Sequence, residues 1–260
     1  MSILDQLADY ARLRTEQSKQ LISAEEIKAK ALSLPKSSFA FENAIKGGNI
    51  SFICECKKAS PSKGIIAEDF PYVKIACEYE SAGADCISVL TEPKWFLGSS
   101  EHLREISHAV SIPCLRKDFI VDEYMIYEAR LLGAAAVLLI CSILSDAELK
   151  EYIDICDSLG LSALTEAHSE EEVMRALRSG ARLIGVNNRD LKDFSVDTEN
   201  SRRLRHLVPS DVLFVSESGI NSAEDIAKLR GTGIDAVLIG ETLMRAPDKK
   251  KKLAELRGNI

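Results

Sequence analysis

The stretch GAAAVLLI, residues 133–140, carries the pattern on which the fold prediction rests. A glycine ends the amphipathic segment 122–132, and a short, wholly apolar run follows it at once. Glycine is a common stop for a helix, and such a run is typical of a strand covered on both faces. The stretch therefore predicts a helix end, a tight turn and a buried strand.

The same pattern recurs along the chain. A glycine stands directly before a strand-like run at Gly83-Ala84, Gly160-Leu161, Gly180-Ala181 and Gly233-Ile234. Strand candidates start near residues 51, 85, 113, 135, 161, 182, 212 and 235, and amphipathic helices are predicted at 71–81, 100–110, 122–132, 145–159, 169–179, 198–206 and 222–230. The mean step of about 26 residues suits one strand, one helix and short loops.

Eight such units predict an α/β protein with the (β/α)8, or TIM, barrel fold. A doubly wound sheet is the alternative, but it rarely needs eight parallel strands and would want a glycine-rich first turn, which this chain lacks. Residues 1–50 are predicted to form a helical extension, because Leu4, Leu7, Tyr10 and Leu13 recur at helical spacing. We expect residues 1–260 to form a single barrel domain with that extension packed on it.

The composition narrows the function. A net charge of −7 argues against nucleic acid as a partner. The seven cysteines are odd in number, form no C-x-x-C pair and lie mostly in apolar runs, which predicts a reducing, cytoplasmic compartment. Neither Cys54-Glu-Cys56 nor the four histidines show metal-ligand spacing, so no metal is expected. No apolar run approaches ~18 residues and the N-terminus lacks an apolar leader, so we expect a protein that neither crosses a membrane nor is secreted.

Polar side chains collect where the predicted strands end, which is where barrel enzymes carry their active sites. They occur after five of the eight strands, as Glu55 with Lys57, Arg116-Lys117-Asp118, Thr165-Glu166, Asn187-Asn188-Arg189 and Ser216-Glu217-Ser218-Gly219. Helix capping would account for Asp118 and Ser218. It does not require a lysine at 117, so this set predicts a functional site.

The first strand and its loop read SFICECKKASPSKG, residues 51–64. The period of two in a strand puts Glu55 and Lys57 on one side, opposite the Phe/Cys face. Either charge buried alone would be costly, so they form a self-satisfied ion pair or part of a site. The Ser-Pro-Ser-Lys-Gly turn that follows is rich in hydroxyls and backbone donors, as an anion-binding loop would be.

The last two loops also suit an anion. Segments 216–220 and 238–242 follow the seventh and eighth strands, and each has a glycine where backbone N–H groups can approach a ligand. Loops at these two positions, with a short extra helix, are a recurrent phosphate site in barrels. Glycines that serve only tight turns are the alternative.

These residues together resemble the indole-3-glycerol phosphate synthase family. The matching stretches are ECKKASPSKG (55–64), SVLTEPKWFLGS (88–99), IPCLRKDFIV (112–121), IGVNNRDL (184–191), SESGI (216–220) and LIGETLM (238–244). They span nearly the whole predicted barrel in the family's order. The resemblance implies a carbon–carbon lyase of tryptophan biosynthesis in its single-function form, acting without metal or cofactor. Such an enzyme would close the ring of 1-(2-carboxyphenylamino)-1-deoxyribulose 5-phosphate, with loss of carbon dioxide and water, to give indole-3-glycerol phosphate.

The resemblance also implies residue roles. Lys117 would be the proton donor to the carbonyl oxygen, and for this it should lie in a dry pocket that lets it release a proton near neutral pH. Glu166 would be the general base of the dehydration. Lys57 would hold the substrate carboxylate and is a second candidate acid, with Glu55 orienting it.

The remaining expected contacts fall into three groups. Asn187 and Glu217 would bind hydroxyls and developing charge. The wall for the anthranilate ring would come from Trp95, Phe96, Phe119 and Leu138. The phosphate would lie among Ser60, Arg189, Ser218, Gly219 and Gly240. We expect the acidic Glu241 to turn away from the phosphate, His168 to cap a surface helix, and the loop 60–68 to close over the substrate.

Two other functions fit part of this pattern. A neighbouring phosphoribosylanthranilate isomerase would be expected to use a cysteine and an aspartate at strand ends, whereas Cys54 and Cys56 are predicted to face the helices. A phosphate-binding barrel retained as a partner subunit would not need Lys57, Lys117 and Glu166 together. The synthase reading is preferred, with a phosphorylated small molecule as its ligand and a monomer as its expected state.

Overall fold

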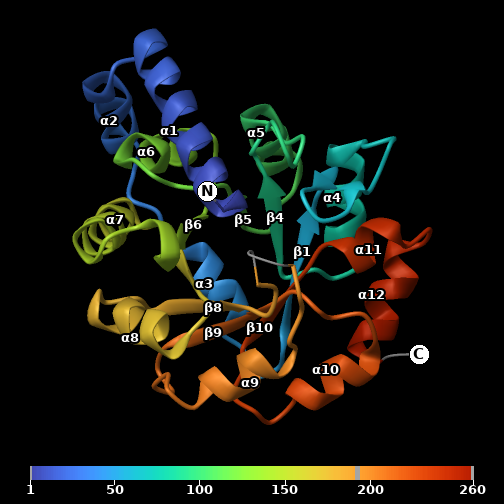
Figure 1. Ribbon diagram of the computed structural model, residues 1–260. Coiled ribbons are helices and arrows are strands. Elements are labelled where there is room, and N and C mark those ends of the chain that lie inside the picture. The colour runs from blue at the N-terminus through green and yellow to red at the C-terminus, as the bar shows by residue number, and fades with distance from the viewer. Residues whose placement is uncertain (1, 191–193, 259–260) are drawn as a thin grey trace.

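A computed structural model describes residues 2–190 and 194–258 of the chain. Within them, eight parallel strands close into a barrel in the order β1-β10-β9-β8-β7-β6-β5-β4 (Figure 1). Their bounds are β1 Ser51–Cys56, β4 Cys86–Leu90, β5 Cys114–Lys117, β6 Ala136–Ile140, β7 Ser162–Ala167, β8 Leu183–Asn187, β9 Leu213–Glu217 and β10 Ala236–Ile239. Each begins within one residue of its predicted start. The predicted TIM barrel is therefore confirmed, and the doubly wound sheet is wrong.

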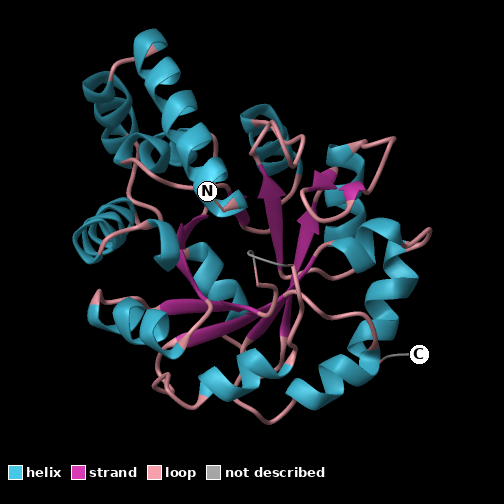
Figure 2. Ribbon diagram, in the orientation of Figure 1, coloured by secondary structure: helices cyan, strands magenta, loops and turns pink. Residues whose placement is uncertain are grey.

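Helices surround the strands (Figure 2). They are α4 Tyr72–Ser81, α5 Ser100–Ala109, α6 Glu123–Leu131, α7 Asp146–Leu159, α8 Glu170–Arg178, α9 Glu199–Arg205, α10 Ala223–Leu229, α11 Glu241–Arg245 and α12 Lys249–Arg257, with a 3₁₀ turn at Cys141–Ile143. Their ends follow from local chemistry. Ser145 caps α7 in a reciprocal box with Glu148, and Gly160 ends it with a φ of 71°.

Three helices precede the barrel: α1 Ile3–Leu21, α2 Ala24–Ser33 and α3 Ala40–Ile45. The first two lie beside α6 (Figure 1), and α3 contacts β1, β4 and β7. Leu7 is buried, but Leu13 is 54% exposed, so the expected apolar stripe of α1 does not reach that residue. Charged contacts complete the docking, since Lys19 Nζ lies 2.6 Å from Asp122 Oδ2 at the start of α6.

The alternation predicted for the first strand is present. Glu55 Oε1 and Lys57 Nζ are 2.6 Å apart on one side of β1. On the other side the guanidinium of Arg257, from α12, lies over the ring of Phe52. The loop after this strand contains a small hairpin that the sequence did not reveal, β2 Ala59–Ser60 paired with β3 Gly64–Ile65. The last residue of the IGVNNRDL motif, Leu191, lies outside the described residues.

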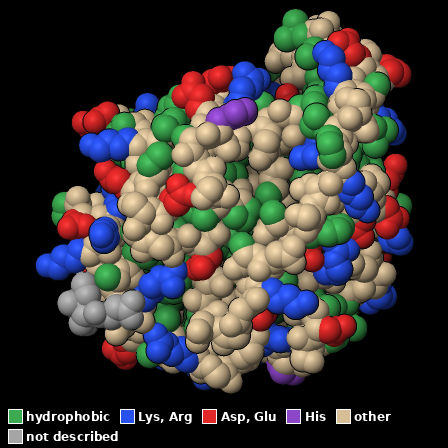
Figure 3. Space-filling model, turned by 180° about the vertical axis from the view of Figure 1, so that it is seen from behind, with side chains coloured by type: hydrophobic (Ala, Val, Ile, Leu, Met, Phe, Trp, Pro, Cys, Tyr) green, Lys and Arg blue, Asp and Glu red, His purple; other side chains and the backbone are tan. Residues whose placement is uncertain are grey.

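The exterior carries charges of both signs. On the face seen in Figure 3, acidic and basic side chains lie interspersed. None of the described helices is long and apolar enough to cross a membrane. All seven cysteines are free, and six of them are buried, which matches their predicted use as small core residues.

Substitution of Gly160 would test how the N-terminal segment packs on the barrel. Its carbonyl accepts from Phe39 N–H, and an added Cβ would lie 1.9 Å from the carbonyl oxygen of Ser37. We expect Gly160→Ala to lower the melting temperature, because it combines left-handed backbone strain of about 1–2 kcal/mol with a backbone clash.

Gly180→Ala is the matched control. Gly180 has a φ of +87° but nothing within 4 Å of an added Cβ, so only the backbone strain applies. Thermal unfolding should show a drop of about 2–4 °C per kcal/mol lost, clearly larger for the variant at position 160. Equal drops would contradict the proposed packing of the segment.

Candidate active site

A cavity of about 690 Å³ opens at the carboxyl ends of the barrel strands. All eight strands contribute to its wall, through Glu55, Leu90, Lys117, Leu138, Ile140, Glu166, Asn187, Glu217, Leu238 and Ile239. We call it the strand-end pocket. It brings together the predicted catalytic set of Glu55, Lys57, Lys117, Glu166, Asn187 and Glu217, which the sequence spreads over more than 160 positions.

Lys117 lies at the centre of a buried charge cluster. Its Nζ is 3.3 Å from Glu166 Oε2 and 3.3 Å from Glu217 Oε2, and the three side chains are 14%, 2% and 2% exposed. Burial alone would lower the pKa of the ammonium, but the nearby carboxylates, Glu217 foremost, raise it above its usual range. The expected burial of Lys117 is present, whereas the expected fall in its pKa does not occur.

Glu55 and Lys57 form a second pair beside this centre. Glu55 also accepts from Ser88 Oγ at 3.3 Å. Burial tends to raise the pKa of Glu55, but Lys57 and Lys117 outweigh it and lower that pKa. A Cβ at Gly240 would lie 2.4 Å from Glu55 Oε1 and 2.9 Å from Lys57 Nζ. Glycine at that position therefore makes room for the ion pair.

Glu217 differs from the other two carboxylates. Burial raises its pKa to about 7, with Lys117 opposing the shift and Glu166 adding to it. Its Oε1 has no hydrogen-bond partner among the described residues. A Cβ at Gly185 would lie 2.3 Å from that same oxygen, so glycine on the neighbouring strand leaves space for it. The pocket thus holds one carboxyl that changes its protonation near neutral pH.

The two asparagines at the end of β8, Asn187 and Asn188, face opposite ways, as the strand period requires. Asn187 lines the pocket, accepts from Arg189 N–H at 3.0 Å and donates to Glu166. Asn188 turns outward, where its Oδ1 accepts from Ser201 Oγ at 2.7 Å. The first belongs to the site and the second holds α9 to the barrel.

The five residues predicted to hold the phosphate, Ser60, Arg189, Ser218, Gly219 and Gly240, all line the pocket. Arg189 also donates to the carbonyl of Phe194 at 3.2 Å. Glu241 lines the pocket instead of turning away from it. Its carboxylate is 3.0 Å from Arg245 Nε and 3.9 Å from Lys63 Nζ, two cationic residues of the pocket that the sequence did not single out.

The apolar wall differs from the prediction at one residue. Phe96, Phe119 and Leu138 line the pocket, and the first two rings lie 6.1 Å apart. Trp95 does not line it, because its ring packs edge-on against Tyr10 of α1 at 5.6 Å. The wall is instead extended by two residues of α1, Ile3 and Leu7, neither of which was predicted to belong to the site.

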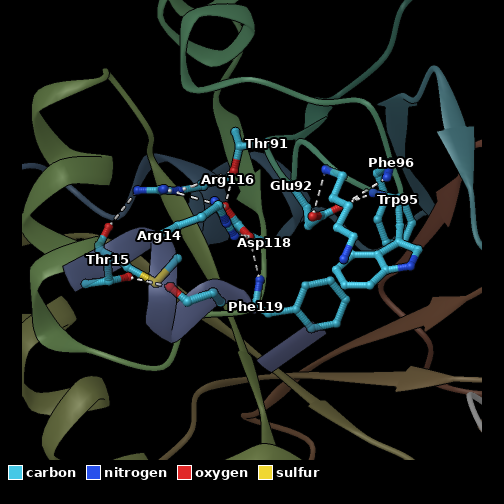
Figure 4. Close-up of polar contacts among 12 residues, drawn as sticks. Arg14, Thr15, Thr91, Glu92, Trp95, Phe96, Arg116, Asp118 and Phe119 are labelled. Atoms are coloured by element: carbon cyan, nitrogen blue, oxygen red, sulfur yellow. Dashed lines mark hydrogen bonds and ion pairs between the residues drawn. The ribbon is translucent and has the colours of Figure 1, made fainter. Parts of the chain in front are cut away.

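A buried network fixes the segment that carries Lys117 (Figure 4). Asp118, expected only as a cap, accepts from Arg14 of α1 at 2.8 Å and from Thr91 Oγ1 at 2.6 Å. Arg116 points outward from β5 and lies 3.5 Å from the same carboxylate. The helical extension is therefore tied by a charged contact to the residue that follows Lys117.

Glu92 plays a comparable part in the loop after β4. It is fully buried, and its carboxylate accepts from the backbone N–H groups of Lys94, Trp95 and Phe96 at 2.7–2.9 Å (Figure 4). These bonds set the direction of the loop. They place the ring of Phe96 in the pocket wall while the neighbouring indole turns toward α1.

His168 is not the surface cap that the sequence predicted. Its side chain is 21% exposed, and its Nε2 lies 3.7 Å from Glu166 Oε1. Ser169, the next residue, is the N-cap of α8. As to metals, the described residues contain no group of three or more His, Cys, Asp or Glu that could hold one.

Comparison with known proteins decides the family. The sequence model for indole-3-glycerol phosphate synthase matches residues 4–256. The chain belongs to this family. It is 58% identical to the indole-3-glycerol phosphate synthase of Ruminiclostridium cellulolyticum over 99% of both chains. It is 52% identical to that of Endomicrobium trichonymphae over 98% of this chain and 99% of the relative. The expected function, synthesis of indole-3-glycerol phosphate by a decarboxylating lyase of tryptophan biosynthesis, is confirmed.

Two similar solved structures support the fold alone. Thiamine phosphate pyrophosphorylase from Pyrococcus furiosus aligns with a TM-score of 0.60 at 19% identity, covering 81% of this chain and 95% of that one. The N-acetylmannosamine-6-phosphate 2-epimerase from Clostridium perfringens gives 0.61 at 17%, covering 79% and 91%. The isomerase and the partner subunit considered from the sequence are not supported.

The raised pKa of Glu217 predicts a pH-dependent stability. The folded protein binds the proton of Glu217 more tightly than the unfolded chain does. Its free energy of unfolding should therefore fall as the pH rises from 4.5, the ordinary pKa of a glutamate, toward 7. Glu217→Gln removes that loss, so it should melt at a higher temperature than the wild type at pH 8. The gap, on the order of a few kcal/mol, should close toward pH 4.5.

Glu224→Gln is the control, since the side chain of Glu224 is 79% exposed on α10. It should stay within about 0.5 kcal/mol of the wild type at each pH. Thermal unfolding between pH 4.5 and 8 measures both variants. A Glu217→Gln protein that is less stable than the wild type at pH 8 would contradict the raised pKa.

Proposed function

We propose that Lys117 is the proton donor of the ring closure and that Glu166 is the general base of the dehydration. The observation that carries this proposal is the position of Lys117 Nζ, 3.3 Å from each of two buried carboxylates inside the strand-end pocket. Those carboxylates keep the lysine protonated until the substrate binds. A protonated donor and an ionised base in contact are the starting states that the reaction needs.

The chemistry assigned to these groups balances as follows. The aromatic carbon that bears the carboxylate bonds to the carbonyl carbon, and Lys117 protonates the carbonyl oxygen to a hydroxyl. The carboxylate leaves as carbon dioxide, and its bonding electrons restore the aromatic ring. The hydroxyl then accepts a proton from the second acid, for which Lys57 is the candidate, and leaves as water, while Glu166 removes a proton from the neighbouring ring carbon to form the double bond. This sequence requires the acid and the base to reach neighbouring atoms of one bound ring.

Lys57 is proposed to hold the substrate carboxylate and is the second candidate acid. Its side chain is 18% exposed, and Glu55 holds it at 2.6 Å, which orients the ammonium. A charge-assisted contact of this kind is stronger than a neutral hydrogen bond. Asn187 on β8 and Glu217 on β9 are proposed to bind the hydroxyl groups and the charge that develops during ring closure.

The two ends of the pocket suit the two ends of the substrate. We propose that Phe96, Phe119 and Leu138 hold the anthranilate ring. The phosphate is proposed to lie among Ser60, Arg189, Ser218, Gly219 and Gly240. The left-handed backbone at Ser218 and Gly219, with φ of 67° and 86°, turns the chain there sharply beside α11.

We further propose that the protein acts as a cytoplasmic monomer. The proposed acid–base set of Lys57, Lys117 and Glu166 lies within a single barrel, so the reaction as proposed needs no residue from a second copy. The free cysteines suit a reducing compartment. Light scattering of the purified protein would measure its mass. A dimer whose dissociation into monomers abolishes the activity would contradict the proposal.

Lys117→Ala tests the assignment of the acid. It should fold and melt cooperatively but lose turnover by about 10²–10⁴-fold, the usual contribution of a positioned acid. Lys150→Ala, which removes an exposed lysine paired with Asp154, should keep wild-type turnover. The assay follows the indole fluorescence of the product from metal-stripped protein. Normal turnover of the Lys117 variant would sink the assignment.

A further inference from the structure

His168 lies next to Glu166 on the side away from the strand-end pocket, and the reaction scheme above gives it no role. It follows β7 and does not line the strand-end pocket, so it does not face the substrate directly. Its Nε2 lies 3.7 Å from Glu166 Oε1, while Lys117 Nζ lies 3.3 Å from Oε2 of the same carboxylate. Each oxygen of Glu166 thus faces a different nitrogen.

The imidazole is held from its other side. Its Nδ1 lies 3.5 Å from Glu172 Oε2, and that oxygen also accepts from the backbone N–H of His168 at 2.7 Å. Glu172 is in the first turn of α8, and Asn200 of α9 donates to the carbonyl of His168 at 3.2 Å. Glu172 of α8 therefore faces the ring, while Asn200 of α9 holds the backbone of the same residue. Its buried Nε2 has no hydrogen-bond partner among the described residues.

Several charged and titratable groups face this pair. Glu166 is faced by Lys117 from β5, Asn187 from β8 and Glu217 from β9, and the buried thiol of Cys141 lies near Glu166 and Glu172. Burial alone would lower the pKa of His168, but Glu172, Glu166 and Glu217 outweigh it and raise that pKa. The geometry places Nε2 of the imidazole against Glu166, and the raised pKa favours the protonated ring.

We propose that His168 is a positioning residue for the reaction, which holds Glu166 from behind and keeps its carboxylate ionised opposite Lys117. The inference rests on the role proposed for Glu166 as general base. The cluster in the pocket has three carboxylates, Glu55, Glu166 and Glu217, against two ammonium groups. A protonated His168 places a positive charge against Oε1 of Glu166 without occupying space needed by the substrate, and Glu172 faces the other ring nitrogen.

His168→Gln is the informative variant, because glutamine has similar length and keeps an N–H but cannot carry the charge. An ionised base loses support when a neighbouring cation is removed, so the pKa of Glu166 should rise. In a plot of kcat against pH, we expect the acidic limb to shift to higher pH by about one unit, with roughly tenfold lower kcat at the low-pH end. KM should change less than twofold.

His108→Gln is the matched control. His108 lies on α5, outside the strand-end pocket, and bonds only a carbonyl of its own helix among the described contacts. Its pH profile should match the wild type. Glu172→Gln should shift the limb in the same direction as His168→Gln, and the double variant should add little, because Glu172 acts through the imidazole.

Two further measurements separate the possible failures. Ring ¹⁵N shifts of His168 should report a doubly protonated imidazole at pH 7, and a neutral ring there would overturn the inference. Glu166→Gln is assayed beside His168→Gln. Retained turnover in Glu166→Gln would contradict the proposed role of Glu166 as the general base. Lost turnover there, with a wild-type profile in a folded His168→Gln protein, would overturn only the role of the histidine.

Discussion

Five largely buried ionisable side chains form one cluster in the strand-end pocket, and the rest of the site depends on keeping their charges balanced. Lys117 is held between Glu166 and Glu217, and Lys57 is held by Glu55. A buried carboxylate or ammonium without a partner would be strongly destabilising, so each group constrains where the others lie. The period of two in parallel strands supplies the placement, because it points every second residue at a strand end into the same space.

The surrounding chain is arranged to leave room for these groups. Gly185 and Gly240 sit where a side chain would strike Glu217 and Glu55. These glycines act through packing, in addition to any contact with phosphate. On the outer side, Arg14 reaches from the N-terminal extension to Asp118, so the segment that presents Lys117 is held by a buried ion pair across 104 residues of sequence. Breaking such a pair leaves an uncompensated buried charge.

The strands, the helices and the polar strand ends were predictable, because periodicity and glycine stops are local properties of sequence. The directions of side chains in loops were harder to predict from the sequence. The direction of Trp95 depends on Glu92, whose bonds to three backbone N–H groups turn the loop. The place of His168 depends on Glu172, one turn into the next helix. Neither dependence leaves a repeat in the sequence, so both residues were assigned wrongly.

The cluster carries one more carboxylate than ammonium groups, although its substrate is itself an anion. That excess would oppose binding if all three carboxylates stayed ionised. Two features of the site reduce it. Glu217, with a pKa raised to about 7, takes up a proton near neutral pH, and the imidazole of His168 stands behind Glu166. In the roles proposed above, the excess charge falls on Glu217, whose pKa is raised, so that Glu166 is left ionised as the proposed base and both lysines stay charged to meet the substrate.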